Sequence, residues 1–134
     1  MISKKIKLLV VDDEKDICKF LSLLFKKRGF SVYTALSGKE AIRIARKVKP
    51  NIALLDIYLK RGIDGFHTLR KIKEFLPDCH CAMVTWDKAK EKIKEARHYG
   101  AVAYLAKPLT ISELSHWVNR LVKRLKKKGG RING

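Results

Sequence analysis

The sequence predicts an α/β fold in which one parallel sheet is covered by helices on both faces. Short apolar runs alternate along the chain with longer segments whose apolar residues recur at helical spacing. The runs show little polar alternation, as expected of strands that are buried on both faces. Five such strands alternating with five helices imply right-handed crossovers between parallel strands. The 134 residues are enough for one domain, and their 46% hydrophobic content is enough for a sizeable core.

The strands are expected where apolar residues are continuous over four to six positions, at residues 6–11, 32–35, 52–55, 81–84 and 102–105. Each strand is followed by a segment in which apolar residues recur every three or four positions. This spacing predicts a helix with one buried stripe in each segment. The stripes contain Ile17, Phe20, Leu21, Leu24 and Phe25; Ala41, Ile44, Ala45 and Val48; Phe66, Leu69, Ile72 and Leu76; Ile93 and Ala96; and Leu114, Trp117, Val118, Leu121 and Leu125.

The boundaries of the helices carry residues that suit them. A cationic last turn followed by glycine is typical of a helix C-terminus, and Ser/Thr-x-x-Glu is the capping box of an N-terminus. The chain has both signals: Lys26-Lys27-Arg28 before Gly29, capping boxes at Ser37/Glu40 and Thr110/Glu113, and Gly100 after the fourth helix. These residues predict the limits of the helices independently of the apolar stripes.

The net charge is +18, from 31 Lys and Arg against 13 Asp and Glu. Such a surface attracts nucleic acid, anionic membrane or an acidic partner, and it does not bear on the fold. No apolar run is long enough to span a bilayer, so no transmembrane segment is expected, and the basic start is too short for a signal peptide. Together with three cysteines, an odd number, these features predict a cytoplasmic protein.

Chemically active side chains follow four of the predicted strands. Asp12 and Asp13 come after the first strand, Asp56 after the third, Thr85 after the fourth and Lys107 after the fifth. In an open parallel sheet, ligands bind at this carboxyl edge. Three carboxylates without imidazole or thiolate favour Mg²⁺, and a carboxylate beside it is a plausible nucleophile for phosphoryl transfer, with the lysine and threonine holding phosphoryl oxygens. Solvated helix caps are the alternative for any one acid near this edge, and Asp13 and Asp64 are candidates for that role. Five compatible residues at this edge favour a site.

Four motifs in order strengthen this interpretation: Val10-Val11-Asp12-Asp13-Glu14, Leu54-Leu55-Asp56, Val84-Thr85 and Tyr104-Leu105-Ala106-Lys107-Pro108. Over about residues 5–121 the chain resembles the receiver domain of two-component response regulators, of the single-domain chemotaxis or sporulation-relay type. The resemblance implies a flavodoxin-like (βα)5 three-layer sandwich with a five-stranded parallel sheet of order 2-1-3-4-5. We therefore expect a receiver domain over residues 1–121 and a basic C-terminal extension of the last helix over residues 122–134.

The resemblance also implies a phosphoacceptor and a metal site. Asp56 would accept a phosphoryl group from a histidine kinase or a histidine phosphotransfer protein, with Mg²⁺ as cofactor. Asp12, Asp13 and Asp56 would hold the Mg²⁺, with Asp13 the more direct ligand of the first pair, and Tyr58 would add its backbone carbonyl. Accepting and losing one phosphoryl group is not turnover, so the chain is not expected to be an enzyme.

A switch follows from the same resemblance. Thr85 and Lys107 would contact the phosphoryl group, and Thr85 would move toward it. Tyr104 would rotate into the vacated space and reshape the face made by the fourth helix, the fifth strand and the fifth helix, where a target protein would bind. In the family, the bond between Lys107 and Pro108 is usually cis.

The chain departs from the family pattern around the site. The residue after the switch threonine is usually small, but here it is Trp86, which we expect to slow the attack of water or to block small phosphodonors. The loop after Asp56 lacks the usual proline and is one residue longer, which Gly62 can absorb in a left-handed conformation. Tyr58 and Asp87 occupy variable positions close to the phosphoryl group, where they would tune its lifetime.

The C-terminal segment keeps several interpretations open. Residues 114–134 hold seven Lys or Arg and no acid. They could form the solvated face of the last helix, a docking strip for an acidic protein, nucleic acid or anionic lipid, or, from Gly129-Gly130, the start of a linker. The rival to a phosphorylation switch is accordingly a phosphorylation-independent module of receiver fold that binds nucleic acid or an acidic partner through its basic surface.

Overall fold

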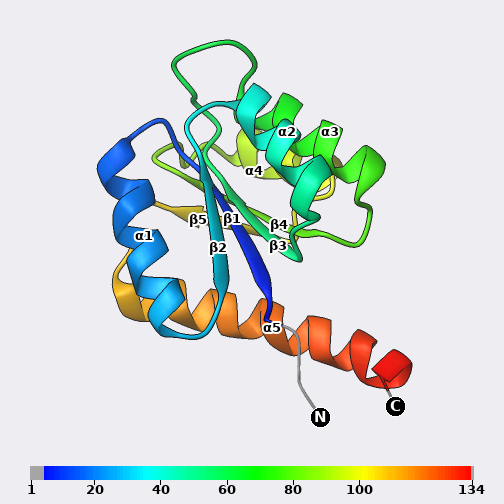
Figure 1. Cartoon of the computed structure of the whole chain (residues 1–134). Coiled ribbons are helices and arrows are strands. Elements are labelled where there is room, and N and C mark those ends of the chain that lie inside the picture. Colours follow the sequence, from blue (N-terminus) through cyan, green and yellow to red (C-terminus); the bar gives the residue numbers. More distant parts are fainter. Residues whose placement is uncertain (1–4, 134) are drawn as a thin grey trace.

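A computed structural model describes the chain from residue 5 to residue 133, and its side chains as far as Lys126. The strands are β1 (Lys7–Val11), β2 (Ser31–Ala35), β3 (Ile52–Leu55), β4 (His80–Thr85) and β5 (Ala103–Ala106). They form one parallel sheet of order β2-β1-β3-β4-β5 (Figure 1). The predicted α/β class and the flavodoxin-like strand order are therefore confirmed.

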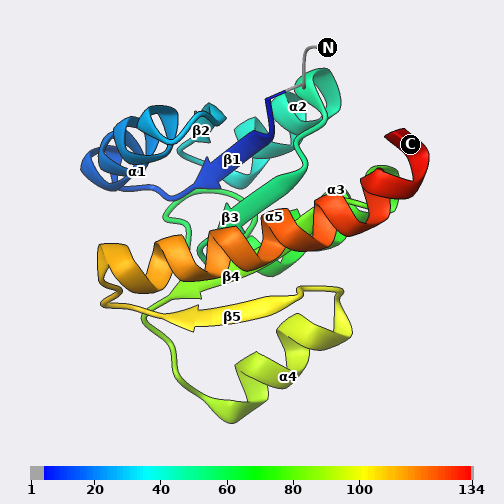
Figure 2. The same cartoon turned by 90° about the horizontal axis from the view of Figure 1, so that it is seen from below.

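The helices are α1 (Lys15–Lys27), α2 (Gly38–Val48), α3 (Gly65–Phe75), α4 (Lys90–His98) and α5 (Ile111–Asn133). Helices α1 and α5 cover one face of the sheet, and α2, α3 and α4 cover the other (Figures 1 and 2). The three layers follow from the strand sequences, since neighbouring side chains in a strand point to opposite faces. In β1, Leu8 and Val10 pack under α1 and α5, whereas Leu9 and Val11 pack under the other three helices.

The helix limits agree with the predicted signals, with one difference. Gly29 and Gly100 have positive φ angles of 92° and 100° and follow α1 and α4. The Thr110 box is reciprocal, but the carboxylate of Glu40 accepts from the Leu36 backbone N–H instead of that of Ser37. The Ser37 hydroxyl still accepts from the Glu40 backbone N–H, so α2 begins where predicted.

Two segments for which the sequence made predictions lie outside the described part of the chain. These are residues 1–4, which begin the chain, and the side chains of residues 127–134, which carry part of the basic segment. The backbone of α5 is helical through Gly129 and Gly130, and no helix in the described part of the chain could cross a membrane. The expected functions of the C-terminal segment stay predictions.

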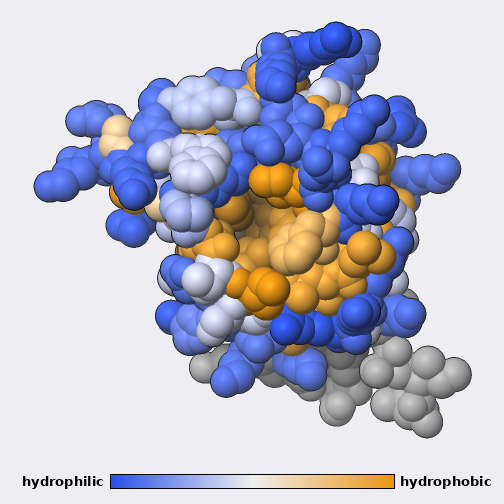
Figure 3. Space-filling view, turned by 90° about the vertical axis from the view of Figure 1, so that its left-hand side faces the viewer, coloured by the Kyte–Doolittle hydropathy of each residue, from blue (hydrophilic) through white to orange (hydrophobic). Residues whose placement is uncertain are grey.

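One face of the molecule carries a hollow with apolar side chains in it (Figure 3). Figure 3 shows apolar side chains gathered in a hollow on the side of the molecule that α1 occupies in Figure 1, with hydrophilic residues around it. Helix α1 contributes two exposed apolar side chains, Phe20 and Leu23. The stripe of α1 that packs on the sheet, with Cys18, Leu21 and Phe25, is buried.

Candidate functional site

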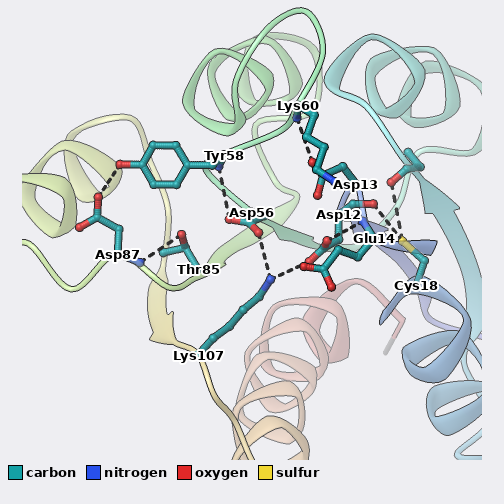
Figure 4. A network of polar contacts seen from close by, with 11 residues as sticks. Asp12, Asp13, Glu14, Cys18, Asp56, Tyr58, Lys60, Thr85, Asp87 and Lys107 are labelled. Atoms are coloured by element: carbon teal, nitrogen blue, oxygen red, sulfur yellow. Dashed lines mark hydrogen bonds and ion pairs between the residues drawn. The ribbon is translucent and has the colours of Figure 1, made fainter. Parts of the chain in front are cut away.

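The carboxyl ends of four strands meet at one edge of the sheet, as predicted (Figure 4). Asp12 follows β1, Asp56 follows β3, Thr85 ends β4 and Lys107 follows β5, and all four side chains are buried. Backbone hydrogen bonds continue the sheet past the strand ends: Asp56 N–H donates to the Val11 carbonyl at 3.1 Å, and Lys107 N–H donates to that of Thr85 at 2.7 Å. The sheet therefore fixes the positions of these residues.

Lys107 lies between the two buried carboxylates. Its Nζ donates to Asp12 Oδ2 at 2.8 Å and to Asp56 Oδ2 at 3.0 Å. Burial alone would lower the pKa of Lys107, but the hydrogen bonds and charges of Asp12 and Asp56 outweigh it and hold that pKa above its ordinary value. The ammonium thus stays charged and offsets the repulsion between two carboxylates that share one pocket.

The second oxygen of each buried carboxylate is held by the local backbone. Glu14 N–H donates to Asp12 Oδ1 at 3.0 Å, and Tyr58 N–H donates to Asp56 Oδ1 at 3.3 Å. In both contacts the aspartate side chain accepts from the backbone N–H two residues later, which is the Asx turn that aspartate favours. Asp56 is therefore oriented from one side by Lys107 and from the other by its own loop.

Asp13 is turned toward the loop that follows β3. Its Oδ2 accepts from the Lys60 N–H at 2.9 Å, and its side chain is only partly buried. Asp13 does not cap α1 at the N-cap position, because Glu14 takes that place without a side-chain cap. The alternative of a simple helix cap is therefore not supported for Asp13.

The acids of this edge suit a hard cation, although none of the described side chains forms a ready three-residue metal cluster of His, Cys, Asp or Glu. Asp12, Asp13 and Asp56 offer only oxygen, the donor type that Mg²⁺ prefers. Mg²⁺ commonly keeps several water ligands and takes one or two carboxylates, so a closed protein cage is not required. The residues present therefore fit Mg²⁺.

The loop between β3 and α3 is shaped by two glycines. Gly62 has a φ of 73°, as predicted for the extra residue, and its surroundings are open. Gly65, the first residue of α3, instead approaches the backbone of the site, because a Cβ there would lie 1.9 Å from the Asp56 carbonyl oxygen. Asp64 caps α3 by accepting from the His67 N–H. The close approach of Gly65 was not predicted from the sequence.

Tyr58 and Asp87, which are predicted to tune the phosphoryl lifetime, are in contact with each other and are linked to Tyr104. The Tyr58 hydroxyl contacts Asp87 Oδ2, and the Tyr104 hydroxyl donates to the Asp87 carbonyl oxygen at 2.5 Å. The hydrogen bond raises the pKa of Tyr58 and lowers that of Asp87, and chiefly burial raises the pKa of Tyr104 to about 12. Trp86 is 60% exposed beside them, so its expected effect on access stays a prediction.

Sequence reasoning named Tyr58 and Asp87 separately but missed their contact. The signal was present, because each residue lies two positions after a site residue, Asp56 or Thr85, at the ends of neighbouring parallel strands. Equal offsets from two site residues on neighbouring strands bring the two side chains to the same end of the sheet. Tyrosine and aspartate form a donor–acceptor pair when they meet.

The chain is similar to known proteins in sequence and in structure. The model of the response regulator receiver domain matches residues 8–119. Sporulation initiation phosphotransferase F of Bacillus subtilis is 31% identical over 114 residues, which are 85% of this chain and 91% of that protein. Transcriptional regulatory protein ZraR of Salmonella typhimurium is 31% identical over 132 residues, which are 98% of this chain but only 30% of ZraR.

The fold is also similar to solved structures. A response regulator receiver domain protein (CheY-like) from Methanospirillum hungatei superimposes with a TM-score of 0.90 at 25% identity, covering 94% of this chain and all of the other. The match takes in nearly the whole chain, so the two proteins share the fold.

Proposed function

The chain belongs to the response regulator receiver domain family, and on that premise we propose that Asp56 is the residue through which it accepts a phosphoryl group. Phosphorylation-dependent signalling is the function of this family, and receiver domains are signalling proteins supplied by histidine kinases or phosphotransfer proteins. The same comparisons do not favour the alternative of a phosphorylation-independent binding module.

One observation carries the assignment: Lys107 Nζ lies 3.0 Å from Asp56 Oδ2 inside a buried pocket. A carboxylate that attacks a phosphoryl group needs a fixed positive charge close to the oxygens that gain charge. Lys107 supplies that charge without further rearrangement of the sheet. Asp12 is also buried and binds the same ammonium at 2.8 Å, so the choice of Asp56 rests on the resemblance of Leu54-Leu55-Asp56 to the phosphoacceptor motif of the family.

The proposed step is a transfer to one Asp56 carboxylate oxygen. That oxygen forms a bond to phosphorus, the phosphorus–nitrogen bond to the donor histidine breaks, and the histidine leaves with the electron pair of that bond. Lys107 would then donate to a phosphoryl oxygen, and the Thr85 hydroxyl would donate to another as it moves toward Asp56. The reverse of the step, or hydrolysis, ends the signal, so no substrate is turned over.

Receiver domains of this family generally bind Mg²⁺. We propose that Asp12, Asp13 and Asp56 hold it here, with the Tyr58 backbone carbonyl. When bound, Mg²⁺ would neutralise charge on the transferred phosphoryl group. Asp13 would have to leave the Lys60 N–H or share its carboxylate between the two partners.

The remaining assignments extend the family function. We place the receiver domain at residues 1–121, the basic extension at residues 122–134 and the protein in the cytoplasm. A target protein would bind the face of α4, β5 and α5, where the hydroxyl of Tyr104, in β5, donates to the Asp87 carbonyl oxygen. Binding of nucleic acid through the basic surface is not favoured.

Intact mass after incubation with Mg²⁺ and a phosphodonor tests the assignment. Acetyl phosphate and a phosphorylated histidine kinase are used in parallel. We expect one phosphoryl adduct that requires Mg²⁺, that is absent in Asp56→Asn, and that forms normally in Asp16→Asn, a matched loss of one exposed carboxylate on α1. An adduct that persists in Asp56→Asn would overturn the assignment.

A further inference from the structure

A hydrogen bond between Asp13 and Lys60 joins two loops next to the buried acids. Asp13 lies between β1 and α1, and its Oδ2 accepts from the backbone N–H of Lys60, in the loop between β3 and α3, at 2.9 Å. Figure 4 shows this contact beside Asp12. We call it the Asp13–Lys60 contact. It depends on a backbone N–H at position 60 and not on the lysine side chain.

Position 60 is one of the places where the chain departs from the family pattern. It lies four residues after Asp56, where the resemblance leads us to expect a proline. Proline has no backbone N–H, so it could not donate to Asp13. Lys60 therefore gives Asp13 a partner that the usual residue cannot supply.

The contact is also what ties down the tip of the loop between β3 and α3. Residues 60–62 are exposed, whereas Leu59 before them is buried. Among the described residues, the bond to Asp13 is the one hydrogen bond that residues 60–62 make. Figure 1 shows this loop extending away from the sheet. Breaking the contact would therefore free the tip without disturbing the core.

The contact keeps Asp13 apart from the two buried acids. Asp12 and Asp56 converge on Lys107 through their Oδ2 atoms, whereas Asp13 is directed to the loop. No three acids among the described side chains are placed to hold one metal ion together. For all three to bind the same ion, Asp13 has to turn from the Lys60 N–H. The hydrogen bond and Mg²⁺ therefore compete for one carboxylate.

We propose that Lys60 is a positioning residue: its backbone N–H holds Asp13 away from the metal site and lowers the affinity for Mg²⁺, and Mg²⁺ binding in turn releases residues 60–62. The inference rests on the proposed function, because it concerns the Mg²⁺ site named there. A hydrogen bond to a metal ligand more often orients that ligand for the ion and raises affinity. Here the bond directs the carboxylate away from the other ligands, so its effect has the opposite sign.

A comparison of Lys60→Pro with Lys60→Ala isolates the backbone N–H. Both variants lose the same side-chain charge, but only the alanine variant keeps the donor to Asp13. We expect Lys60→Pro to bind Mg²⁺ about threefold to tenfold more tightly than Lys60→Ala, the range for one hydrogen bond of ordinary net strength. Titration of Mg²⁺ followed by tryptophan fluorescence measures both affinities, with circular dichroism to establish that each variant is folded. Equal affinities, or weaker binding by Lys60→Pro, would overturn the proposal.

The same pair of substitutions in Asp13→Asn shows whether the effect passes through Asp13. If it does, the two double variants bind Mg²⁺ with equal, reduced affinity, because the competing carboxylate is gone. If the proline variant still binds more tightly there, proline acts through the shape of the loop, and the role given to the N–H is wrong.

Amide exchange of the parent, followed by NMR, needs no substitution and decides the matter if Lys60→Pro does not fold. We expect the Lys60 amide to lose its protection when Mg²⁺ is added. The Gly65 amide, which donates to the Ile57 carbonyl at 2.7 Å, is the internal control and should exchange as before. A Lys60 amide that stays protected at saturating Mg²⁺ would contradict the proposal.

Failure of this inference can be told from failure of the proposed function. A parent that binds Mg²⁺ but forms no phosphoryl adduct would contradict the assignment of Asp56, and the comparison of Lys60→Pro with Lys60→Ala would still decide the role of Lys60. A parent that forms the adduct but whose Mg²⁺ affinity is the same in both variants would retain the proposed function and overturn the inference.

Discussion

The ammonium group of Lys107 lies 3.0 Å from the Asp56 carboxylate, and both groups are buried. The same ammonium also binds Asp12 at 2.8 Å, so one cation separates two acids that would otherwise repel each other. A charge placed in advance needs no reorganisation when a phosphoryl group arrives. The arrangement stabilises the pocket, and under the proposed function it would also serve the phosphoryl transfer.

Removing this cation should weaken the fold. Lys107→Met would leave Asp12 and Asp56 facing each other without compensation, and we expect the free energy of unfolding at pH 7 to fall by about 3 kcal/mol. Urea unfolding followed by circular dichroism measures the change. Lys94→Met, at an exposed position of α4, is the control and should stay within about 0.5 kcal/mol of the parent. Equal stability of the two variants would contradict the role given to Lys107.

Trp86 should control the access of small molecules to Asp56. It directly follows Thr85 and is 60% exposed, so its indole is not buried in the core, and we expect it to cover the site. In Trp86→Ala we expect faster labelling by acetyl phosphate and faster loss of phosphate. Phe20→Ala removes an aromatic ring of similar exposure from α1 and serves as the control. Rates that do not differ between Trp86→Ala and the parent would show that the indole does not cover the site.

Asp13 should contribute to binding of Mg²⁺. Removing a residue that hydrogen-bonds to a metal ligand lowers metal affinity by about tenfold to a hundredfold. Asp13→Asn would remove a charged ligand itself, so we expect its Mg²⁺ affinity to fall by at least about tenfold. Titration of Mg²⁺ followed by tryptophan fluorescence measures it, since Trp86 lies beside the site. Glu14→Gln removes the adjacent acid, whose side chain makes no cap contact, and should bind Mg²⁺ like the parent. Unchanged affinity in Asp13→Asn would remove Asp13 from the ligand set.

Two glycines of the same loop should respond differently to alanine. Gly62→Ala meets no neighbour within 4 Å and only has to adopt a φ of 73°, which should cost about 1 kcal/mol. Gly65→Ala places a methyl group 1.9 Å from the Asp56 carbonyl oxygen, so the end of β3 must shift. We expect a loss of about 3 kcal/mol and slower phosphorylation in Gly65→Ala. Thermal unfolding and the intact-mass assay would show the contrast, and its absence would mean that the loop yields freely.

Tyr104 should ionise only in strongly alkaline solution. Burial raises its pKa to about 12 from an ordinary value of 10.0, so the folded state favours the neutral phenol. The stability that this gives is complete below pH 10 and is lost as the pH rises from 10 toward about 12. Absorbance of tyrosinate follows the titration. Tyr104→Phe should remove a late component of the curve and leave the early part unchanged; loss of an early component would contradict the burial of this phenol.

The elements could be predicted because their signals are local. Apolar runs and stripes gave all five strands and all five helices, with strand limits that differ from the structure by one residue at most at either end. Gly29 and Gly100 follow the ends of α1 and α4, where both adopt the positive φ angle that glycine tolerates. The bond between Lys107 and Pro108 is cis, as the resemblance implied. Strand order came from the resemblance, because periodicity alone does not say which strands are neighbours.

The sequence by itself determined which residues would meet at the carboxyl edge of the sheet. A parallel sheet aligns its strand ends, so Asp12, Asp56, Thr85 and Lys107 follow from the strand limits alone. Only the tertiary structure decided how these side chains divide their contacts. Whether Lys107 separates the acids, whether Asp13 turns to Lys60, and whether Tyr58 reaches Asp87 depend on the paths of loops and on side-chain rotamers, which no spacing along the chain encodes.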